Sequence, residues 1–422
     1  MHRIAIRLSK IMRALLLILD SVGCGGAPDA AAYGDEGSDT LAHIYERTPG
    51  FALPNLERLG LAKILNHADA ATPEASWGRM RERSAGKDTT TGHWEIAGAV
   101  LDEPFTVFRK FPDELVRAIE REAGVEFIGN YPASGTVILD ELGPEHLRTG
   151  KPILYTSADS VLQIAAHEAL VPLPRLYEIC KIARRHCDPV RIGRVIARPF
   201  VGDLGAFRRT AGRHDYAMLP PHTVLNSIAE SDRSVHGVGK ISDIFARSGI
   251  TASTPTASNA EGMTAIENLW PGLDGLLFAN LVDFDMHFGH RRNVAGYADA
   301  LLAFDRWLPC FLATVNPDDL IIITADHGND PTWRGTDHTR EEVPLLVLHG
   351  GNADALGTRA TFADVAATLA DFFGVTACPY AQSFLPKSRR CPTQRAPNPK
   401  SEILNLKSDA HPQLHRKKTR RP

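Results

Sequence analysis

Carboxylates and histidines stand at the ends of strongly apolar stretches in this chain of 422 residues. The run ALLLILD ends at Asp20, GLLFANLVDFD ends at Asp285 with His290 close behind, and DLIIITADHGND carries Asp326 and His327. Burying a carboxylate beside an imidazole costs several kcal/mol unless a cation or a donor compensates it. Since the pattern recurs along one chain, it predicts a metal centre.

The types of donor indicate which metal would bind. A further histidine, His338 in GTDHTR, brings the candidate ligands to six, and none of them is a cysteine. Aspartate and histidine without cysteine favour Mn²⁺, Mg²⁺ or Zn²⁺. Six side chains exceed what one such ion takes while leaving room for substrate, so we expect two ions about 4 Å apart, an arrangement that suits phosphoryl transfer. Each residue taken alone also fits a structural role, because aspartate caps helices and forms turns.

A nucleophile is expected in the polar loop GKDTTTGHWE, residues 86–95. A hydroxyl becomes a good nucleophile when metal coordination lowers its pKa. The loop carries three hydroxyls, on Thr89, Thr90 and Thr91, before a possible short helix whose N-terminus would favour a phosphate. The alternative is that one threonine merely caps that helix. The pattern alone leaves both possibilities open.

The elements that must position these residues are strands and helices of an α/β fold. Runs that are apolar throughout, at 14–20, 275–285, 319–330 and 343–350, predict strands covered on both faces, as in a largely parallel sheet. Ligands of such sheets bind beyond the carboxyl ends of the strands. Helices are predicted at 296–315 and at 360–374, the second ending at Gly374.

A change in the pattern of apolar and helical segments after about residue 103 predicts that a second domain is inserted into the first. We expect a metal-binding core of residues 13–103 and 222–385, interrupted by a smaller α+β cap domain of residues 104–221 that recognises substrate. Residues 1–12 form an N-terminal extension, and residues 386–422 form a basic tail, predicted to be disordered because it has little apolar content. ALLLIL is too short for a signal peptide and is predicted to be a buried strand.

Composition narrows the class of protein. The chain is 43% hydrophobic and 23% charged with a net charge of −3, as expected of a soluble globular protein. Six cysteines without a CxxC pair give no support to a zinc finger. No apolar run is long enough to span a bilayer. We therefore expect a cytoplasmic monomer that acts on small molecules and binds neither membrane nor nucleic acid.

Eleven long motifs carry a resemblance to a known family, and they read LDSVGCGGAPDA, GSDTLAHI, GKDTTTGHWEIAG, PASGT, YTSADSVLQIAAHE, RVIARPFVG, RHDYA, GKISDIF, NLVDFDMHFGHRR, TADHGNDPT and GTDHTREEVPLL. They follow the order found in the phosphopentomutases, metalloenzymes of the alkaline phosphatase superfamily, and the chain resembles that family from about residue 14 to about 385. The resemblance implies an alkaline-phosphatase-like core whose mainly parallel sheet is flanked by helices, with an inserted, mobile cap. It also implies two bound Mn²⁺ ions, or Mg²⁺ or another divalent ion in their place, and a phosphorylated threonine.

The resemblance also assigns roles in the metal centre. The threonine that follows Lys-Asp, Thr89, is the phosphorylated one and bridges the two metals. Of the two aspartates in NLVDFD, the family pattern selects Asp285 over Asp283. The resemblance divides the six ligands into two sets, which are Asp20, Asp326 and His327 for one metal, and Asp285, His290 and His338 for the other.

In the cap, the resemblance implies contacts with a sugar phosphate. Asp159, with Ser157 nearby, matches a residue that reads sugar hydroxyls. Arg198 and Arg213 match phosphate contacts, for which a planar guanidinium is suited. Lys240 in GKISD is a further candidate.

Four neighbouring residues are not expected to contact the substrate. His93 and Trp94 are expected to support the Thr89 loop, while Arg208 and Arg209 are expected to be solvated. The implied reaction converts ribose 1-phosphate, or its 2-deoxy form, into the 5-phosphate through a phosphothreonine and a 1,5-bisphosphate. A sugar bisphosphate is then the expected activator.

Three alternatives stay open from the sequence. A metal-dependent phosphatase or sulfatase would share the core, since a fold alone does not specify a function. A phosphoglycerate mutase would also share it, but that family uses serine as its nucleophile. A non-catalytic binding protein would act through the basic tail.

Overall fold

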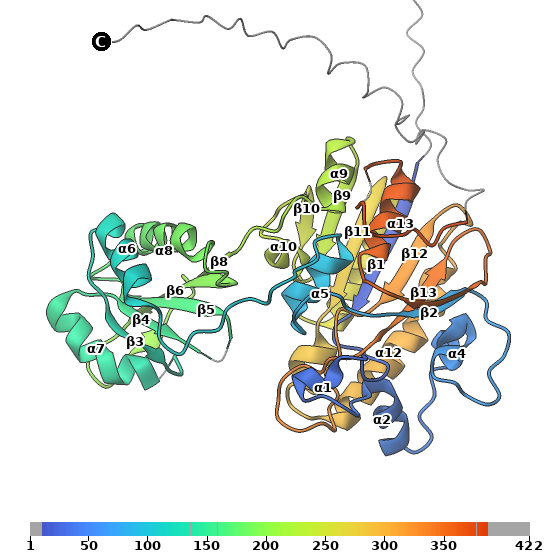
Figure 1. Cartoon of the computed structure of the whole chain (residues 1–422), viewed down its shortest axis with the longest axis horizontal. Coiled ribbons are helices and arrows are strands. Elements are labelled where there is room, and N and C mark those ends of the chain that lie inside the picture. The colour runs from blue at the N-terminus through green and yellow to red at the C-terminus, as the bar shows by residue number, and fades with distance from the viewer. Residues whose placement is uncertain (1–10, 136, 158, 377, 387–422) are drawn as a thin grey trace, which may run out of the picture.

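The structure is a computed structural model, and it describes residues 11–135, 137–157, 159–376 and 378–386. Most of the predicted N-terminal extension and of the predicted basic tail therefore lies outside the described residues. Figure 1 shows two lobes, each built around a sheet of its own, with eight strands in the larger and six in the smaller.

The larger sheet has the order β10-β9-β11-β1-β12-β13-β2-β14. Its strands are β1 (Arg13–Leu19), β2 (Ser76–Met80), β9 (Ser234–Val238), β10 (Ala252–Thr254), β11 (Gly275–Leu281), β12 (Leu320–Thr324), β13 (Val343–Leu348) and β14 (Ala355–Arg359). The five strands from β10 to β12 run parallel, whereas β13 is antiparallel to both β12 and β2. All four predicted apolar runs are strands, and they lie side by side as β11, β1, β12 and β13, so the prediction of an α/β fold with a mainly parallel sheet is confirmed.

Helices surround this sheet. They are α1 (Ala30–Tyr33), α2 (Thr40–Arg47), α3 (Pro54–Leu56), η1 (Glu57–Leu61), α4 (Ala62–Ile64), α5 (Thr89–Ile96), α9 (Val224–Glu230), α10 (Ile241–Ile244), α11 (Asn259–Leu269), η2 (Trp270–Gly272), η3 (Phe284–Gly289), α12 (Val294–Leu312) and α13 (Asp364–Phe373). The helices predicted at 296–315 and 360–374 correspond to α12 and α13, and α13 ends at Gly374, whose φ of 70° is left-handed.

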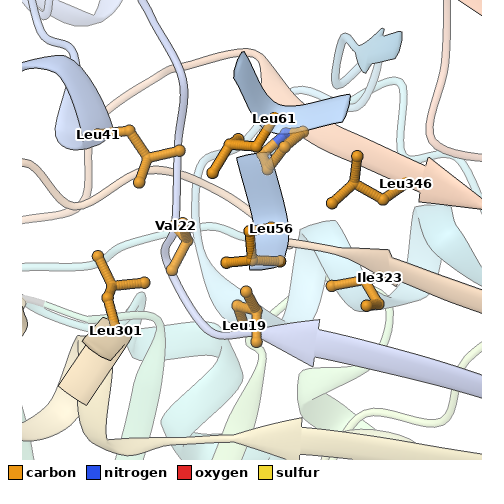
Figure 2. Close-up of a pocket in the computed structure, with 9 residues that line it drawn as sticks. Leu19, Val22, Leu41, Leu56, Leu61, Leu301, Ile323 and Leu346 are labelled. Carbon is orange, nitrogen blue, oxygen red and sulfur yellow. The ribbon is translucent and has the colours of Figure 1, made fainter. Parts of the chain in front are cut away.

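The two faces of the sheet pack against different helices, because successive strand residues point to opposite sides. On one face, Leu19 and Ile323 meet Leu41 of α2, Leu56 of α3 and Leu301 of α12 around a small cavity with a wholly apolar lining (Figure 2). Such a cavity has no polar group for a phosphorylated sugar and belongs to the core. On the other face, α5 packs on β11 through the stacked rings of His93 and Phe278.

The smaller sheet has the order β3-β4-β5-β6-β7, with β8 paired to β6. It consists of β3 (Ile128–Pro132), β4 (Ile153–Thr156), β5 (Val161–His167), β6 (Arg194–Val201), β7 (Arg208–Arg209) and β8 (His214–Ala217), accompanied by α6 (Asp113–Ala123), α7 (Val137–Thr149) and α8 (Leu173–Cys187). These elements come from one continuous stretch of chain between α5 and α9. The domain boundaries at 104 and 221 stay a prediction.

The predicted first strand is β1, whose residues from Ala14 to Leu19 are all buried. No helix among the described residues has both the length and the apolar character that crossing a bilayer would need.

Candidate metal centre

The candidate ligands meet at one edge of the larger sheet. Asp20 follows β1 directly, and Asp326 and His327 come two and three residues after the end of β12. Asp285 lies in η3, a π-helical segment that begins shortly after β11. Because β11, β1 and β12 are neighbours and parallel, their carboxyl ends converge, and the side chains that follow them are brought together.

The first compact group is formed by Asp20, Asp326 and His327, whose ligand atoms lie within 4.8 Å of one another. All three residues are buried. Nε2 of His327 is 3.6 Å from Oδ1 of Asp20 and 3.3 Å from Oδ2 of Asp326. Nδ1 of His327 donates to the carbonyl of Gly328, 3.0 Å away, so Nε2 is the ring nitrogen that faces the two carboxylates and would be the one to bind a metal.

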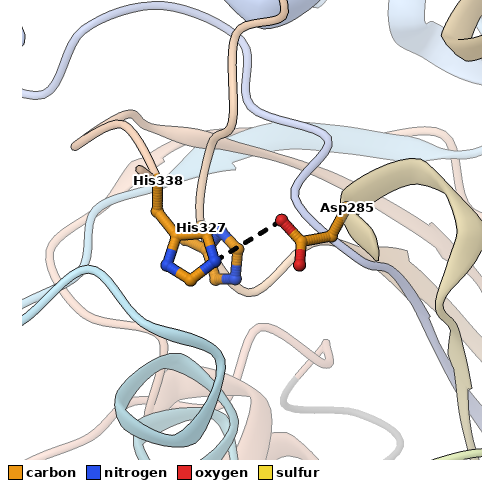
Figure 3. Close-up of side chains that lie close together, drawn as sticks. All are labelled: Asp285, His327 and His338. Atoms are coloured by element: carbon orange, nitrogen blue, oxygen red, sulfur yellow. Dashed lines mark ion pairs between the residues drawn. The ribbon is translucent and has the colours of Figure 1, made fainter. Parts of the chain in front are cut away.

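The second compact group contains Asp285, His327 and His338, again within 4.8 Å (Figure 3). The dashed line in Figure 3 joins Asp285 to a histidine, and Nε2 of His338 lies 3.4 Å from Oδ1 of Asp285. His290 adjoins this group, with Nε2 3.2 Å from Oδ2 of Asp285 and 3.1 Å from Nε2 of His338. The resemblance divides the ligands into two separate sets, whereas in the geometry His327 belongs to both compact groups.

The buried carboxylates of the two groups would be stabilised by a positive charge placed among them. Burial raises the pKa of Asp20 well above its usual range, and the neighbouring carboxylates Asp326 and Asp285 raise it further. Burial works against a charged His327, but the carboxylates, Asp326 above all, hold the pKa of His327 well above its usual range. For Asp285, burial opposes ionisation, yet the hydrogen bonds from His290 and His338 keep its pKa well below the ordinary value.

The residues present fit a divalent cation. Oδ1 of Asp20 is buried and has no hydrogen-bond partner within the described part of the chain, and the buried Oδ2 of Asp326 has ring nitrogens of His93 and His327 at 3.0 and 3.3 Å. Unpaired buried carboxylate oxygens are costly, and carboxylates with imidazoles are the donors that Mn²⁺, Mg²⁺ and Zn²⁺ accept. A cation between these oxygens and Nε2 of His327 would remove the cost.

Thr89 is the hydroxyl residue that faces this centre. Its Oγ1 lies 3.1 Å from Nε2 of His327. The helix cap is Asp88, whose Oδ1 accepts from the backbone N–H groups of Thr90 and Thr91, so the alternative of a threonine cap is wrong. Thr91 is fully buried, and its hydroxyl donates to Oδ2 of Asp88. Since Asp88 occupies these two amides, the predicted phosphate site at this helix N-terminus is not formed by them.

The loop before Thr89 is anchored on both sides. Lys87 Nζ lies 2.9 Å from Oδ2 of Asp35 and 3.4 Å from Oδ2 of Asp337. The buried guanidinium of Arg340 pairs with Oε2 of Glu82 at 2.6 Å and donates to the backbone carbonyls of residues 82, 84 and 86. Arg340 is two residues from His338, so the nucleophile loop and the His338 segment are tied together.

Several supporting residues were missed by sequence reasoning. Asn280 Nδ2 donates to Oδ2 of Asp20 at 3.1 Å, and Asn329 Nδ2 donates to Oδ1 of Asp285 at 2.7 Å. A signal existed for Asn280, because it is a polar residue inside the apolar run GLLFANL. Asn329 lies in DHGND, where its role could not be told from that of a turn residue.

The predicted sugar and phosphate contacts lie mainly in the smaller lobe (Figure 1). Asp159 is exposed, and its backbone N–H donates to Oγ of Ser157 at 3.4 Å. Arg198 of β6 donates to Gln163 at 3.0 Å, and Arg213 pairs with both carboxylate oxygens of Asp215 at 2.7 Å. The structure thus brings Thr89 and the metal-ligand candidates together but places these four residues in the other lobe.

Lys240 belongs to the larger lobe. It precedes α10 directly, and its charge lowers the pKa of Asp20, against the stronger effects of burial and the neighbouring carboxylates. Its position is therefore on the side of the metal centre rather than on the side of the arginines.

Arg209, which was expected to be solvated, is exposed in the structure, and it also lies near the candidate phosphate contacts. Its guanidinium donates to the hydroxyl of Tyr155 at 3.4 Å. Burial lowers the pKa of Arg198, and the charges of Arg213 and Arg209 lower it further. Three guanidinium groups therefore gather around Tyr155, an arrangement that attracts an anion.

Comparison with known proteins finds relatives that match most of the chain. The sequence model of the Metalloenzyme superfamily matches residues 12–377. The chain is 54% identical over 372 residues to the phosphopentomutase of Carboxydothermus hydrogenoformans, with 86% of this chain and 96% of that protein aligned. It is 54% identical over 375 residues to the phosphopentomutase of Syntrophotalea carbinolica, covering 87% and 96%. Among solved structures, that of the PH0037 protein from Pyrococcus horikoshii aligns at 15% identity with a TM-score of 0.46, covering 86% of this chain and 98% of that one.

Proposed function

The chain belongs to the phosphopentomutase family of metalloenzymes, and from this premise we propose that it interconverts ribose 1-phosphate, or 2-deoxyribose 1-phosphate, and the 5-phosphate through a phosphorylated Thr89. It is an isomerase, and the superfamily together with the two donor groups supports the use of a divalent metal ion. The observation that carries the proposal is the position of Thr89 Oγ1, 3.1 Å from Nε2 of His327.

We further propose two Mn²⁺ ions. Their ligands would be Asp20, Asp326 and His327 for one, and Asp285, His290 and His338 for the other, and Oγ1 of Thr89 lies 3.1 Å from Nε2 of His327, which belongs to both compact groups. When bound, the ions would neutralise charge on the transferring phosphoryl group and lower the pKa of the Thr89 hydroxyl.

The reaction would proceed by two transfers at Thr89. In the first, the bond between phosphorus and Thr89 Oγ1 breaks while a bond forms from phosphorus to the free hydroxyl oxygen of the sugar. That hydroxyl loses one proton and Thr89 Oγ1 gains one, which leaves a 1,5-bisphosphate. In the second transfer the bisphosphate, turned round, returns its other phosphoryl group to Thr89. A sugar bisphosphate would therefore activate enzyme that has lost its phosphate.

The smaller lobe would hold the rest of the substrate. Arg198 and Arg213 suit a phosphate because a guanidinium donates to two of its oxygens at once. Asp159 and Ser157 would accept and donate hydrogen bonds at the sugar hydroxyls. Since these residues and Thr89 stand on different lobes, a substrate held by both lies between the lobes, and their approach would exclude water that would otherwise hydrolyse the phosphothreonine.

One assay separates a mutase from a phosphatase on the same core. The chain is incubated with Mn²⁺, ribose 1-phosphate and a trace of ribose 1,5-bisphosphate, and both ribose 5-phosphate and free phosphate are measured. We expect ribose 5-phosphate to form with little release of phosphate. Release of phosphate without the 5-phosphate product would reject the mutase reaction and favour the phosphatase.

The same assay tests the nucleophile. Thr89→Ala should abolish turnover, whereas Thr90→Ala serves as the matched control and should retain it, because Thr90 contributes to the Asp88 cap through its backbone N–H. Mass spectrometry of the peptide spanning residues 86–95 should find the phosphate on Thr89. Activity in the Thr89 variant, or phosphate on another threonine, would contradict the assignment.

A further inference from the structure

His93 lies between the proposed nucleophile and a proposed metal ligand. The residue belongs to α5 and is fully buried. Its Nδ1 is 2.9 Å from the backbone carbonyl oxygen of Thr89 and 3.0 Å from Oδ2 of Asp326. One ring nitrogen thus contacts both the residue that would carry the phosphate and the carboxylate that would hold a metal.

The contacts determine where the imidazole proton sits. A carbonyl and a carboxylate oxygen can only accept, so Nδ1 must carry the hydrogen. Nε2 is buried without a hydrogen-bond partner among the described residues, and the ring stacks on Phe278 with centroids 5.9 Å apart. The ring is therefore fixed by packing on one side and by the Nδ1 contacts on the other.

The backbone next to His93 is equally close to Asp326. A Cβ atom placed on Gly92 would lie 2.1 Å from the carbonyl oxygen of Asp326, so only glycine allows α5 to approach this closely. Oδ1 of Asp326 accepts from the backbone N–H of Ser21 at 3.0 Å, whereas Oδ2 has no backbone donor among the described residues and lies 3.0 Å from Nδ1 of His93. His93 is thus positioned to restrain the oxygen of Asp326 that the backbone leaves free.

We propose that His93 is a positioning residue, whose Nδ1–H holds Oδ2 of Asp326 in place for the metal and fixes the start of α5, so that Thr89 and the metal centre keep one relative position. The proposal rests on the proposed function, in which Asp326 binds metal and Thr89 carries the phosphate. Loss of a group that orients a metal ligand typically costs 10–100-fold in metal affinity.

Three substitutions separate the hydrogen bond from packing. His93→Asn places an amide N–H close to where Nδ1–H lies, whereas His93→Gln places it where Nε2 lies. His93→Phe retains the stacking on Phe278 but has no donor. His236→Asn is the matched control, because His236 is a partly buried histidine of β9 that contacts Thr254 in the same lobe.

The full chain is stripped of metal by a chelator and titrated with Mn²⁺, with free Mn²⁺ followed by electron paramagnetic resonance and the melting temperature of each metal-free variant measured. We expect His93→Phe and His93→Gln to raise the Kd for Mn²⁺ by about 10–100-fold. His93→Asn should recover most of this loss, and the His236 variant should bind as the unmodified chain does.

Equal Mn²⁺ affinity of His93→Phe and the unmodified chain would overturn the proposal. If the Phe variant does not fold, the Asn and Gln variants decide, because they differ only in where the N–H lies, and equal Kd values for the two would also overturn it. These titrations need no turnover. A chain that binds Mn²⁺ as expected but converts no ribose 1-phosphate would therefore reject the proposed reaction and not the role of His93.

Discussion

Replacing Glu95 by alanine should loosen the loop that leads into Thr89. Glu95 is fully buried in α5, and its carboxylate accepts from the backbone N–H groups of Arg83, Ser84 and Phe362 at 2.6–3.1 Å. The hydroxyl of Thr361 donates to it at 2.7 Å. One side chain therefore joins the nucleophile helix to the loop before it and to the turn before α13.

The magnitude follows from the number of donors. In Glu95→Ala three backbone N–H groups lose their acceptor in a buried place, and each costs about 1–3 kcal/mol unless water enters. The Thr361 hydroxyl can rotate to another partner. Partial relaxation brings the expected loss to about 4–6 kcal/mol, at the upper end for a single substitution. Thr361→Ala removes one donor to Glu95 and also leaves the backbone N–H of Ala363 without the hydroxyl that accepts from it at 3.1 Å, so it should cost about 1–3 kcal/mol, less than Glu95→Ala.

Hydrogen exchange measured by mass spectrometry is the direct assay. Peptides that cover residues 81–86 and 359–364 should lose protection in Glu95→Ala, while a peptide of α8 in the smaller lobe should exchange as before. Turnover should fall as well, because the loop no longer holds Thr89 in one position. The Thr361 variant provides the control.

Unchanged protection of the amides of Arg83, Ser84 and Phe362 in the Glu95 variant would refute the reasoning. Protection lost evenly over both lobes would refute it too, because that result means global unfolding and not release of one loop.

Three further predictions concern charge. Burial raises the pKa of Glu341 to about 7 from the usual 4.5. Between these pH values the folded chain therefore binds one more proton than the unfolded chain. Because of this proton, the free energy of unfolding should fall by about 3 kcal/mol as the pH rises from 4.5 to above 7. Glu341→Gln should flatten this dependence in urea titrations at pH 5 and 8, and identical slopes would contradict the assignment. Asp20→Asn should raise the melting temperature of the metal-free chain, because burial and the neighbouring carboxylates disfavour the charged form of Asp20. The same substitution should weaken Mn²⁺ binding. A metal-free variant that melts at a lower temperature than the unmodified chain would argue against this repulsion. Arg213→Ala should raise KM for ribose 5-phosphate more than it lowers kcat, since its guanidinium is expected to bind the substrate phosphate, and steady-state kinetics with an unchanged KM would reject that contact.

The candidate metal ligands could be predicted from the sequence because each of them lies in or next to a short, recognisable apolar segment. A short apolar run bounded by polar turns indicates a strand buried on both faces, and a carboxylate at its end must either meet a cation or a donor or face water. This reasoning found β1, β11 and β12 and placed Asp20, Asp285 and Asp326 at one edge of the sheet. The resemblance then selected Thr89 among three threonines, and the contact of its hydroxyl with His327 agrees with that choice.

Tertiary structure alone decided how these residues share the space. The order β11-β1-β12 depends on which apolar faces pack, and no local pattern reports it. The place of His327 in both ligand groups follows from that order, because His327 follows β12 and so faces the ligands that follow β1 and the loop that carries His338.

Residues whose partners are distant in the sequence could not be assigned from local patterns either, because their contacts also depend on the packing of the fold. Asn280 donates a hydrogen bond to Asp20, and Arg209 donates one to Tyr155. His93 contacts Asp326, which is 233 positions later in the sequence. A side chain's type and neighbours in sequence describe what it can donate or accept. Which partner it meets depends on the fold, since packing brings the partner from another segment. For this chain, the sequence determined the inventory of donors and the strands that present them, and the tertiary structure decided the pairing among them.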